Sequence, residues 1–440
     1  MSFTVSLSAA EKKTYPAPNY DENKIPLFKL PDPLIAEDGS KITSEKQWTE
    51  KRRAEILHLF EENVYGKCRL DKVKMKAELL ESEPAFNGTA TRWQFQLTFY
   101  IGNEPAADSP KAAFLLYTPK NADKAAQDKE TLKKTPVFLG LNFMGNHACH
   151  TDPGIFLAKT IWDRGSGKPE SGKEDERGKQ IRRWNFEMLT WSGVAVGTVY
   201  YGDIEPDYNG GIKNGVRRLI YGDIEKEDGV KPAPNDGNAI STWAWGLSKM
   251  LDLVIEFQDK LNIDPEKTCV IGHSRLGKTS LWAGATDPRF AVTISNDSGC
   301  GGAALSRREI GETVERINGT FPHWFCDNFK KYNKSVNDLP VDQHELLALI
   351  APRGVCVASA TEDIWADPKG EFLSCYYADP VYRLFGTNGF NGAKEQPKAN
   401  EGIGGIIHYH LREGKHDILD FDWQQYIDYA HKHFADKHSE

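Results

Sequence analysis

The 440-residue chain contains no apolar run long enough to cross a membrane and no surplus of basic residues. A bilayer-spanning helix needs about 18 or more consecutive apolar residues, and nucleic-acid binding depends on clustered Lys and Arg. Here 55 Lys and Arg stand against 63 Asp and Glu, which gives a net charge of −8 at pH 7. We therefore expect a soluble globular protein with neither a membrane nor a nucleic-acid partner.

Paired cysteines are also absent from the sequence. None of the seven cysteines stands in a C-x-x-C pair, so neither a disulfide framework nor a zinc site is indicated. His408 and His410 alternate along a predicted strand and so share one face of it. Because no third ligand is evident, we interpret both as strand residues and predict neither a metal nor a cofactor.

The first residues, MSFTVSLSAAEKK, lack the basic region and apolar core of a signal peptide. Two alternatives stay open, a cytoplasmic protein or one whose leader has been removed before this start. Residues 1–40 contain five prolines and little periodicity, which predicts an extended N-terminal segment on the surface of the protein. Residues 41–440 are then expected to form a single domain.

Short apolar runs rich in β-branched residues alternate with helical segments in the later part of the chain. A capping box at Ser44 and Gln47 opens a predicted helix that ends near residue 63, and alternating residues over 73–117 predict antiparallel strands. Strands buried on both faces are predicted at 136–141, 194–200, 268–271, 290–295, 354–360 and 406–411. The pattern predicts a three-layer α/β sandwich with a central, mostly parallel sheet and antiparallel leading strands, with insertions near 163–178, 208–238 and 307–339.

The stretch CVIGHSRLGKTS, residues 269–280, matches two unrelated motifs. It fits the phosphate loop G-x-x-x-x-G-K-[ST], in which Lys278 would reach a nucleotide phosphate and Thr279 would bind magnesium. It also places Ser274 two residues after a strand-ending glycine, as in the nucleophile elbow of a hydrolase. The second glycine stands at 277 rather than 276, so G-x-S-x-G is missed by one place. The motif alone leaves both interpretations open.

Residues further along the chain favour the elbow. An α/β-hydrolase carries its nucleophile, acid and histidine in that order, with the acid and the histidine after later strands. Asp363 follows the predicted strand 354–360, and His416 follows the last predicted strand. Because a phosphate loop predicts nothing about these positions, we predict an α/β-hydrolase with Ser274 as nucleophile and His416 as base.

Five stretches carry a resemblance to a known family: GHSRLGK (272–278), NDSGCGGAA (296–304), GETVERIN (311–318), WADP (365–368) and REGKH (412–416). From about residue 40 onward the chain resembles the bacterial glucuronoyl esterases, carbohydrate esterase family 15. The resemblance implies a serine esterase that cleaves the ester between glucuronic or 4-O-methylglucuronic acid of xylan and a lignin alcohol. It further implies a secreted or periplasmic enzyme, because such polymers lie outside the cell, and we expect a monomer.

The resemblance also implies roles for individual residues. Arg275 would stabilise the oxyanion, Lys278 and Glu312 would bind sugar hydroxyls, and Trp365 would form a platform beside the sugar ring. The fungal members flank their serine and histidine with paired cysteines, whereas His273 and Asp417 occupy these positions here.

Two questions stay open at this point. The acid is either Asp363, which we prefer because it occupies the usual hydrolase position, or Asp297, as an alternative or assisting acid. The rival activities are an acetyl-xylan or methyl-uronate esterase with the same triad and, from another class, a nucleotide-binding protein that uses Lys278 and Thr279.

Overall fold

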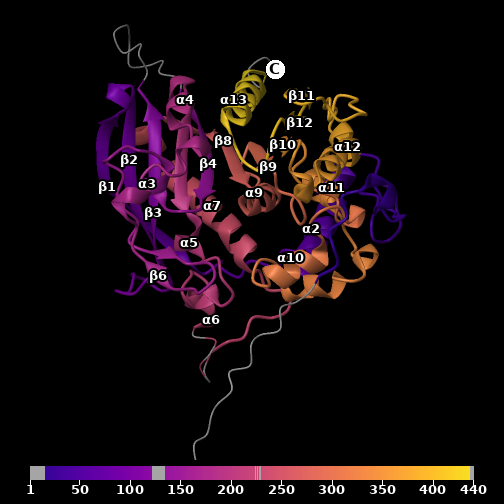
Figure 1. Cartoon of the computed structure of the whole chain (residues 1–440), viewed down its shortest axis with the longest axis horizontal. Helices are drawn as coiled ribbons and strands as arrows, with labels where there is room; N and C mark the ends of the chain where they lie inside the picture. The colour runs from indigo at the N-terminus through magenta and orange to yellow at the C-terminus, as the bar shows by residue number, and fades with distance from the viewer. Residues whose placement is uncertain (1–14, 121–133, 223, 225, 227–228, 437–440) are drawn as a thin grey trace, which may run out of the picture.

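The computed structural model describes residues 15–120, 134–222, 224, 226 and 229–436, so the first part of the predicted N-terminal segment lies outside it. In this part of the chain the largest sheet has ten strands in the order β1-β2-β3-β7-β4-β8-β9-β10-β12-β11 (Figure 1). The antiparallel leading strands are β1 (Lys74–Ala85), β2 (Ala90–Tyr100) and β3 (Lys111–Pro119). They lie at one edge of the sheet, as predicted.

The inner strands run parallel to one another. They are β7 (Ala195–Tyr200), β4 (Thr135–Asn142), β8 (Ile263–His273), β9 (Val292–Asn296), β10 (Gly354–Ala360) and β12 (Ile407–Arg412). All coincide closely with the predicted strands except β8, which begins earlier because Ile263 pairs with Thr135 across a bulge. The sequence did not predict β11 (Glu401–Gly404), which pairs antiparallel with β12 at the far edge.

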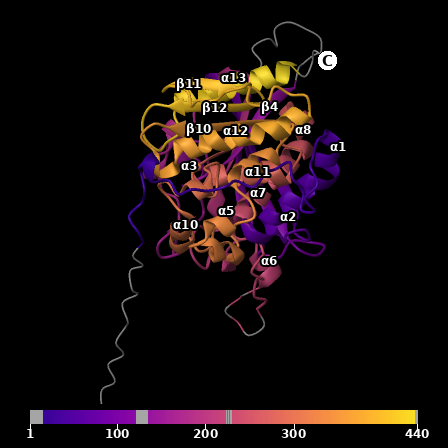
Figure 2. The same ribbon diagram turned by 90° about the vertical axis from the view of Figure 1, so that its right-hand side faces the viewer.

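Helices cover both faces of the sheet (Figures 1 and 2). One core contains side chains of α2 (Arg53–Asn63), α7 (Ala239–Glu256), α9 (Arg275–Thr286), α11 (Gln343–Ala348) and α12 (Pro368–Leu384), and the other contains side chains of α4 (Phe186–Trp191) and α13 (Asp420–Asp436). Alternate strand residues serve the two cores, with Val137 and Leu139 in the first and Phe138 in the second. The predicted three-layer α/β-hydrolase architecture is therefore confirmed.

The predicted helix at 44–63 forms, but it is not uniform. Ser44 caps α1 (Glu45–Gln47) by accepting a hydrogen bond from the Gln47 backbone, and a π-helical turn (Trp48–Arg52) separates α1 from α2. The other short α-helices within the described ranges are α3 (Asn146–Cys149), α5 (Tyr201–Ile204), α6 (Arg218–Tyr221), α8 (Gln258–Leu261) and α10 (Val314–Thr320).

The predicted insertions carry little regular structure. Segment 163–178 follows β5 (Ile161–Trp162) and contains β6 (Pro169–Glu170), which pairs with it. Segment 208–238 contains α6, with residues 223, 225, 227 and 228 outside the described part, and segment 307–339 contains α10. Within the described ranges, no helix combines the length and apolarity required to cross a bilayer.

Candidate active site

Ser274 occupies a sharp turn between β8 and α9. Its backbone adopts φ 58° and ψ −127°, a strained conformation for a residue with a side chain. The Ser274 backbone N–H donates to the Asn296 carbonyl at 2.9 Å. A Cβ atom at Gly272 would collide with the Leu276 carbonyl, and one at Gly277 would lie 3.0 Å from the Ser298 Cβ. The elbow therefore leaves no room for a side chain at 272 and little at 277, which explains why the second glycine stands at 277 rather than 276.

The contacts of this loop contradict the phosphate-loop alternative. The backbone N–H groups of Gly277 and Lys278 donate to the Ser274 carbonyl, so they do not surround an anion. The Lys278 ammonium donates to the Ser298 carbonyl, and the buried Thr279 hydroxyl donates to the Arg275 carbonyl at 3.0 Å. The nucleotide-binding interpretation is wrong because the loop backbone N–H groups that would hold phosphate and the Thr279 hydroxyl that would bind magnesium are engaged within the fold.

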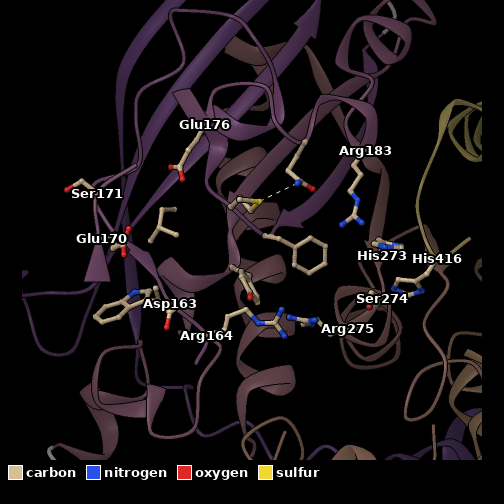
Figure 3. Close-up of a pocket in the computed structure, with 16 residues that line it drawn as sticks. Asp163, Arg164, Glu170, Ser171, Glu176, Arg183, His273, Ser274, Arg275 and His416 are labelled. Carbon is tan, nitrogen blue, oxygen red and sulfur yellow. Dashed lines mark hydrogen bonds between the residues drawn. The ribbon is translucent and has the colours of Figure 1, made fainter. Parts of the chain in front are cut away.

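His416 and Asp363 come together at the carboxyl ends of β12 and β10. The His416 Nδ1 atom lies 2.5 Å from Asp363 Oδ2. The Asp363 side chain is 5% exposed, whereas the His416 side chain is 39% exposed and lies beside Ser274 on the wall of the same cavity (Figure 3). The three residues therefore have the arrangement of a nucleophile, a base and an acid that orients the base.

Asp297 follows β9 and lies close to this pair without joining it. Its Oδ2 atom accepts a hydrogen bond from the Asp417 backbone N–H at 3.1 Å and lies 3.7 Å from the Arg412 guanidinium. Its Oδ1 atom has no hydrogen-bond partner among the described residues. Burial, together with the charges of Glu371 and Asp363, raises the pKa of Asp297 well above its usual value. Asp363 therefore contacts the His416 ring, whereas Asp297 contacts the backbone of Asp417, the residue that follows His416.

His273, which the sequence analysis did not single out as functional, packs against His416. The two ring centroids are 4.6 Å apart, and the His273 Nδ1 atom lies 2.6 Å from the Asn296 Oδ1 atom. Burial and the nearby His416 lower the pKa of His273 well below its usual value. His273 is therefore uncharged at neutral pH and places no positive charge beside His416.

The predicted sugar-binding residues Lys278, Glu312 and Trp365 are not among those that line the cavity beside Ser274. Lys278 is buried in α9, and burial lowers its pKa while the charge of Glu312 opposes the shift. Burial raises the pKa of Glu312, and the charges of Lys278 and Arg275 oppose that shift. The Glu312 backbone N–H donates to the carbonyl of Trp365, whose side chain is 36% exposed and faces the Arg316 guanidinium at 5.4 Å.

A cavity of about 540 Å³ opens beside Ser274 (Figure 3). Besides Ser274, Arg275 and His416, it is lined by aromatic and basic side chains that sequence analysis missed, among them Phe143, Trp162, Arg164, Arg183 and Tyr201. Several of these residues come from segment 161–183, which has no periodic pattern to mark it. Only the rule that ligands bind beyond the carboxyl ends of parallel strands would have pointed to the loops after β4 and β7.

Two groups among the described residues have ligand atoms within 4.8 Å of one another, close enough to consider a metal ion. In Asp297, Asp363 and His416, the histidine Nδ1 is already paired with Asp363. The second group corrects our expectation that no third ligand lies near His408 and His410. Cys356 lies there because β10 pairs with β12 and sets Cys356 opposite His408. His410 Nε2 is paired with Asp422 at 2.9 Å, and all three side chains lie outside the lining of the Ser274 cavity.

The sheet, the elbow and the histidine-acid pair define a serine hydrolase of the α/β-hydrolase class. A family model described as fungal glucuronyl esterase matches residues 233–386. A carbohydrate esterase from an unknown prokaryotic organism is 46% identical over 95% of this chain and 92% of its own length. The structure of a glucuronoyl esterase from Solibacter usitatus, 42% identical, superposes with a TM-score of 0.84 over 93% of this chain and 99% of that chain.

A 4-O-methyl-glucuronoyl methylesterase from Wolfiporia cocos is 35% identical over 35% of this chain and 40% of its own length. The chain therefore belongs to the glucuronoyl esterases of carbohydrate esterase family 15, which are carboxylic ester hydrolases. The resemblance seen in the sequence motifs is confirmed.

Proposed function

We propose that this protein hydrolyses the ester between glucuronic or 4-O-methylglucuronic acid of xylan and a lignin alcohol, through an acyl-enzyme. The observation that carries the proposal is the elbow serine beside His416, whose Nδ1 atom lies 2.5 Å from Asp363. The names of the relatives, glucuronoyl esterase and 4-O-methyl-glucuronoyl methylesterase, support the uronate substrate.

In the proposed reaction, His416 removes the proton of Ser274 while the serine oxygen attacks the uronate carbonyl carbon. The ester bond to the alcohol then breaks, and His416 returns the proton to the departing alkoxide. Water attacks the acyl-enzyme by the same route and releases the uronic acid and Ser274. Asp363 accepts the Nδ1–H of His416 throughout, which keeps Nε2 free to take the serine proton.

Charge that develops on the carbonyl oxygen needs hydrogen-bond donors. The Arg275 backbone N–H lies at the start of α9, where the helix dipole favours negative charge. One such donor is worth about 3–4 kcal/mol of transition-state stabilisation in a site that excludes water. Asp297 assists in this proposal only by holding the backbone beside His416.

Lys278, Glu312 and Trp365 are proposed to bind the uronate sugar. Lys278 is buried and Glu312 is partly buried, and the charge of each opposes the pKa shift that burial causes in the other, while Trp365 leaves an aromatic surface exposed. Such convergent polar groups beside an apolar surface are typical of ligand sites. The cavity in Figure 3 would then bind the alcohol part of the ester.

The test compares hydrolysis of benzyl glucuronate and of acetylated xylan by the wild-type protein, Ser274→Ala and Ser82→Ala. Ser82 is exposed on β1 and serves as the matched control. We expect glucuronate cleavage that Ser274→Ala abolishes and Ser82→Ala leaves unchanged. Cleavage that survives Ser274→Ala would refute the nucleophile, and release of acetate alone would favour an acetyl-xylan esterase. We also propose a secreted or periplasmic monomer, which fractionation of the native cells and light scattering would test.

A further inference from the structure

Asp207 is a buried carboxylate at the carboxyl end of the sheet, a few residues beyond β7 and α5. Its side chain is 1% exposed, and both of its carboxylate oxygens have hydrogen-bond or ion-pair partners. Burial alone would raise the pKa of Asp207, but the hydrogen bond from His323 and the charges of Arg275 and Arg164 outweigh it and hold the pKa well below its usual value. Asp207 is therefore a permanent negative charge at neutral pH.

Five side chains from four separate segments contact this carboxylate. Oδ2 lies 2.6 Å from Arg275 Nη1, 2.9 Å from Arg164 Nε and 2.8 Å from the Tyr201 hydroxyl, and Oδ1 lies 2.9 Å from His323 Nε2 and 2.7 Å from Trp324 Nε1. In Figure 3 the guanidinium groups of Arg164 and Arg275 approach each other at this point. With both oxygens occupied by several donors, the carboxylate has a single orientation.

Arg275 is held by rings as well as by Asp207. Its guanidinium carbon lies 4.9 Å from the Trp324 ring centroid and 5.5 Å from that of Phe143, with Trp324 itself bonded to Asp207. Arg275 directly follows Ser274 and lines the same cavity. Asp207 therefore faces two guanidinium groups, and one of them belongs to the residue next to Ser274.

We propose that Asp207 is a positioning residue that fixes the Arg275 guanidinium beside the carbonyl group attacked by Ser274. Asp207 also contacts Arg164 of segment 163–178, and His323 and Trp324 of segment 307–339. These two segments therefore help to fix the position of the Arg275 guanidinium. The inference rests on the proposed serine-esterase mechanism, but it applies to any ester that Ser274 attacks.

A double-mutant cycle tests the proposal through kcat and KM. We expect Asp207→Asn to lower kcat about 10- to 100-fold with KM changed less than about threefold. A displaced Arg275 guanidinium would stabilise the oxyanion of the transition state less, while substrate binding would change little. Arg275→Met should lower kcat by a similar or larger factor, and the double variant should match Arg275→Met alone. Equal losses in both backgrounds, or an unchanged kcat in Asp207→Asn, would overturn the proposal.

Two further variants separate positioning from folding. Asp203→Asn, on neighbouring α5, changes a carboxylate that accepts a hydrogen bond from the Ala113 backbone N–H, and we expect wild-type kcat. His323→Leu removes one donor to Asp207 and should lower kcat about 3- to 10-fold, again only when Arg275 is present. If Asp207→Asn does not fold, the cycle of His323→Leu with Arg275→Met tests the proposal instead. A loss of kcat from His323→Leu that persists in the Arg275→Met background would contradict it.

The choice of substrate separates this inference from the proposed function. p-Nitrophenyl acetate carries no uronate, yet its tetrahedral intermediate develops the same oxyanion. If the wild-type protein cleaves this ester but no glucuronate ester, the proposed substrate is wrong, and the cycle still tests Asp207. If kcat for p-nitrophenyl acetate is insensitive to Asp207→Asn while Ser274→Ala abolishes it, the positioning role fails and the nucleophile stands.

Discussion

Replacing Asp363 by asparagine keeps the size of the side chain and removes its charge. In the wild-type protein the carboxylate accepts the Nδ1–H of His416 at 2.5 Å. The asparagine amide would donate to Nδ1 instead, which moves the imidazole proton to Nε2. A protonated Nε2 cannot accept the proton of Ser274, so Asp363→Asn should retain the fold and lose most of the activity.

The magnitude follows from the geometry. His416 is positively charged after it takes the serine proton, and unit charges about 4 Å apart attract by about 4 kcal/mol at an effective dielectric of about 20. Asp363 is buried, but solvent reaches the 39%-exposed His416 side chain and screens part of this attraction. A remaining loss of about 3 kcal/mol is more than 100-fold in rate. Together with the wrong tautomer, we expect kcat to fall about 10³- to 10⁴-fold.

The assay measures kcat and KM for benzyl glucuronate with Asp363→Asn, Asp297→Asn and the wild-type protein. Asp297 is the matched control because it is a buried carboxylate in the same cluster that contacts the Asp417 backbone instead of His416. Asp297→Asn should lose less than about tenfold. If Asp297→Asn carried the large loss and Asp363→Asn were nearly as active as the wild type, the assignment of the acid would be refuted.

Three further predictions concern the elbow, the titration of Asp297 and the sugar contact of Glu312. Gly272→Ala adds a Cβ that collides with a backbone carbonyl, so we expect a loss of about 2–4 kcal/mol in unfolding free energy by denaturant titration, whereas Gly193→Ala, with open space around it, should lose about 1 kcal/mol. Because the raised pKa of Asp297 makes the folded state bind more protons than the unfolded one, stability should fall as pH rises above about 4. Asp297→Asn should flatten that fall, and melting temperatures that track the wild type from pH 5 to 8 would contradict it. Glu312→Gln should raise KM for benzyl glucuronate about tenfold with little change for p-nitrophenyl acetate, and equal changes for both would exclude a sugar contact.

The central strands could be predicted because their burial on both faces produces continuous apolar runs. β10 was predicted to the residue, since Gly354–Ala360 is fully buried and bounded by polar turns. β11 was missed because Glu401–Gly404 is short, half glycine and partly exposed at the sheet edge, and only its partner β12 makes it a strand. The early start of β8 depends on the pairing of Ile263 with Thr135, which no local pattern encodes.

The candidate triad could be predicted for a related reason. Parallel strands end at the same edge of the sheet, so polar residues that follow successive strands meet there. This rule places Asp297, Asp363 and His416 together, as the structure does, but it cannot tell which carboxylate points at the histidine. That choice depends on the conformation of the loop around His416, because the Asp417 backbone N–H in this loop donates a hydrogen bond to Asp297. Asp207 was missed because its partners come from segments without periodicity.

Strain separates the two interpretations of CVIGHSRLGKTS in a way that residue identity cannot. A phosphate loop directs successive backbone N–H groups at an anion, whereas here Ser274 takes a positive φ and its carbonyl accepts the N–H groups of Gly277 and Lys278. The turn closed in this way places Ser274 on the wall of the cavity. Asp297 at the end of the neighbouring strand also has a positive φ, so two adjacent strand ends hold strained, non-glycine residues. Such strain persists only where the surrounding structure enforces it, and at Ser274 it falls on the predicted nucleophile itself.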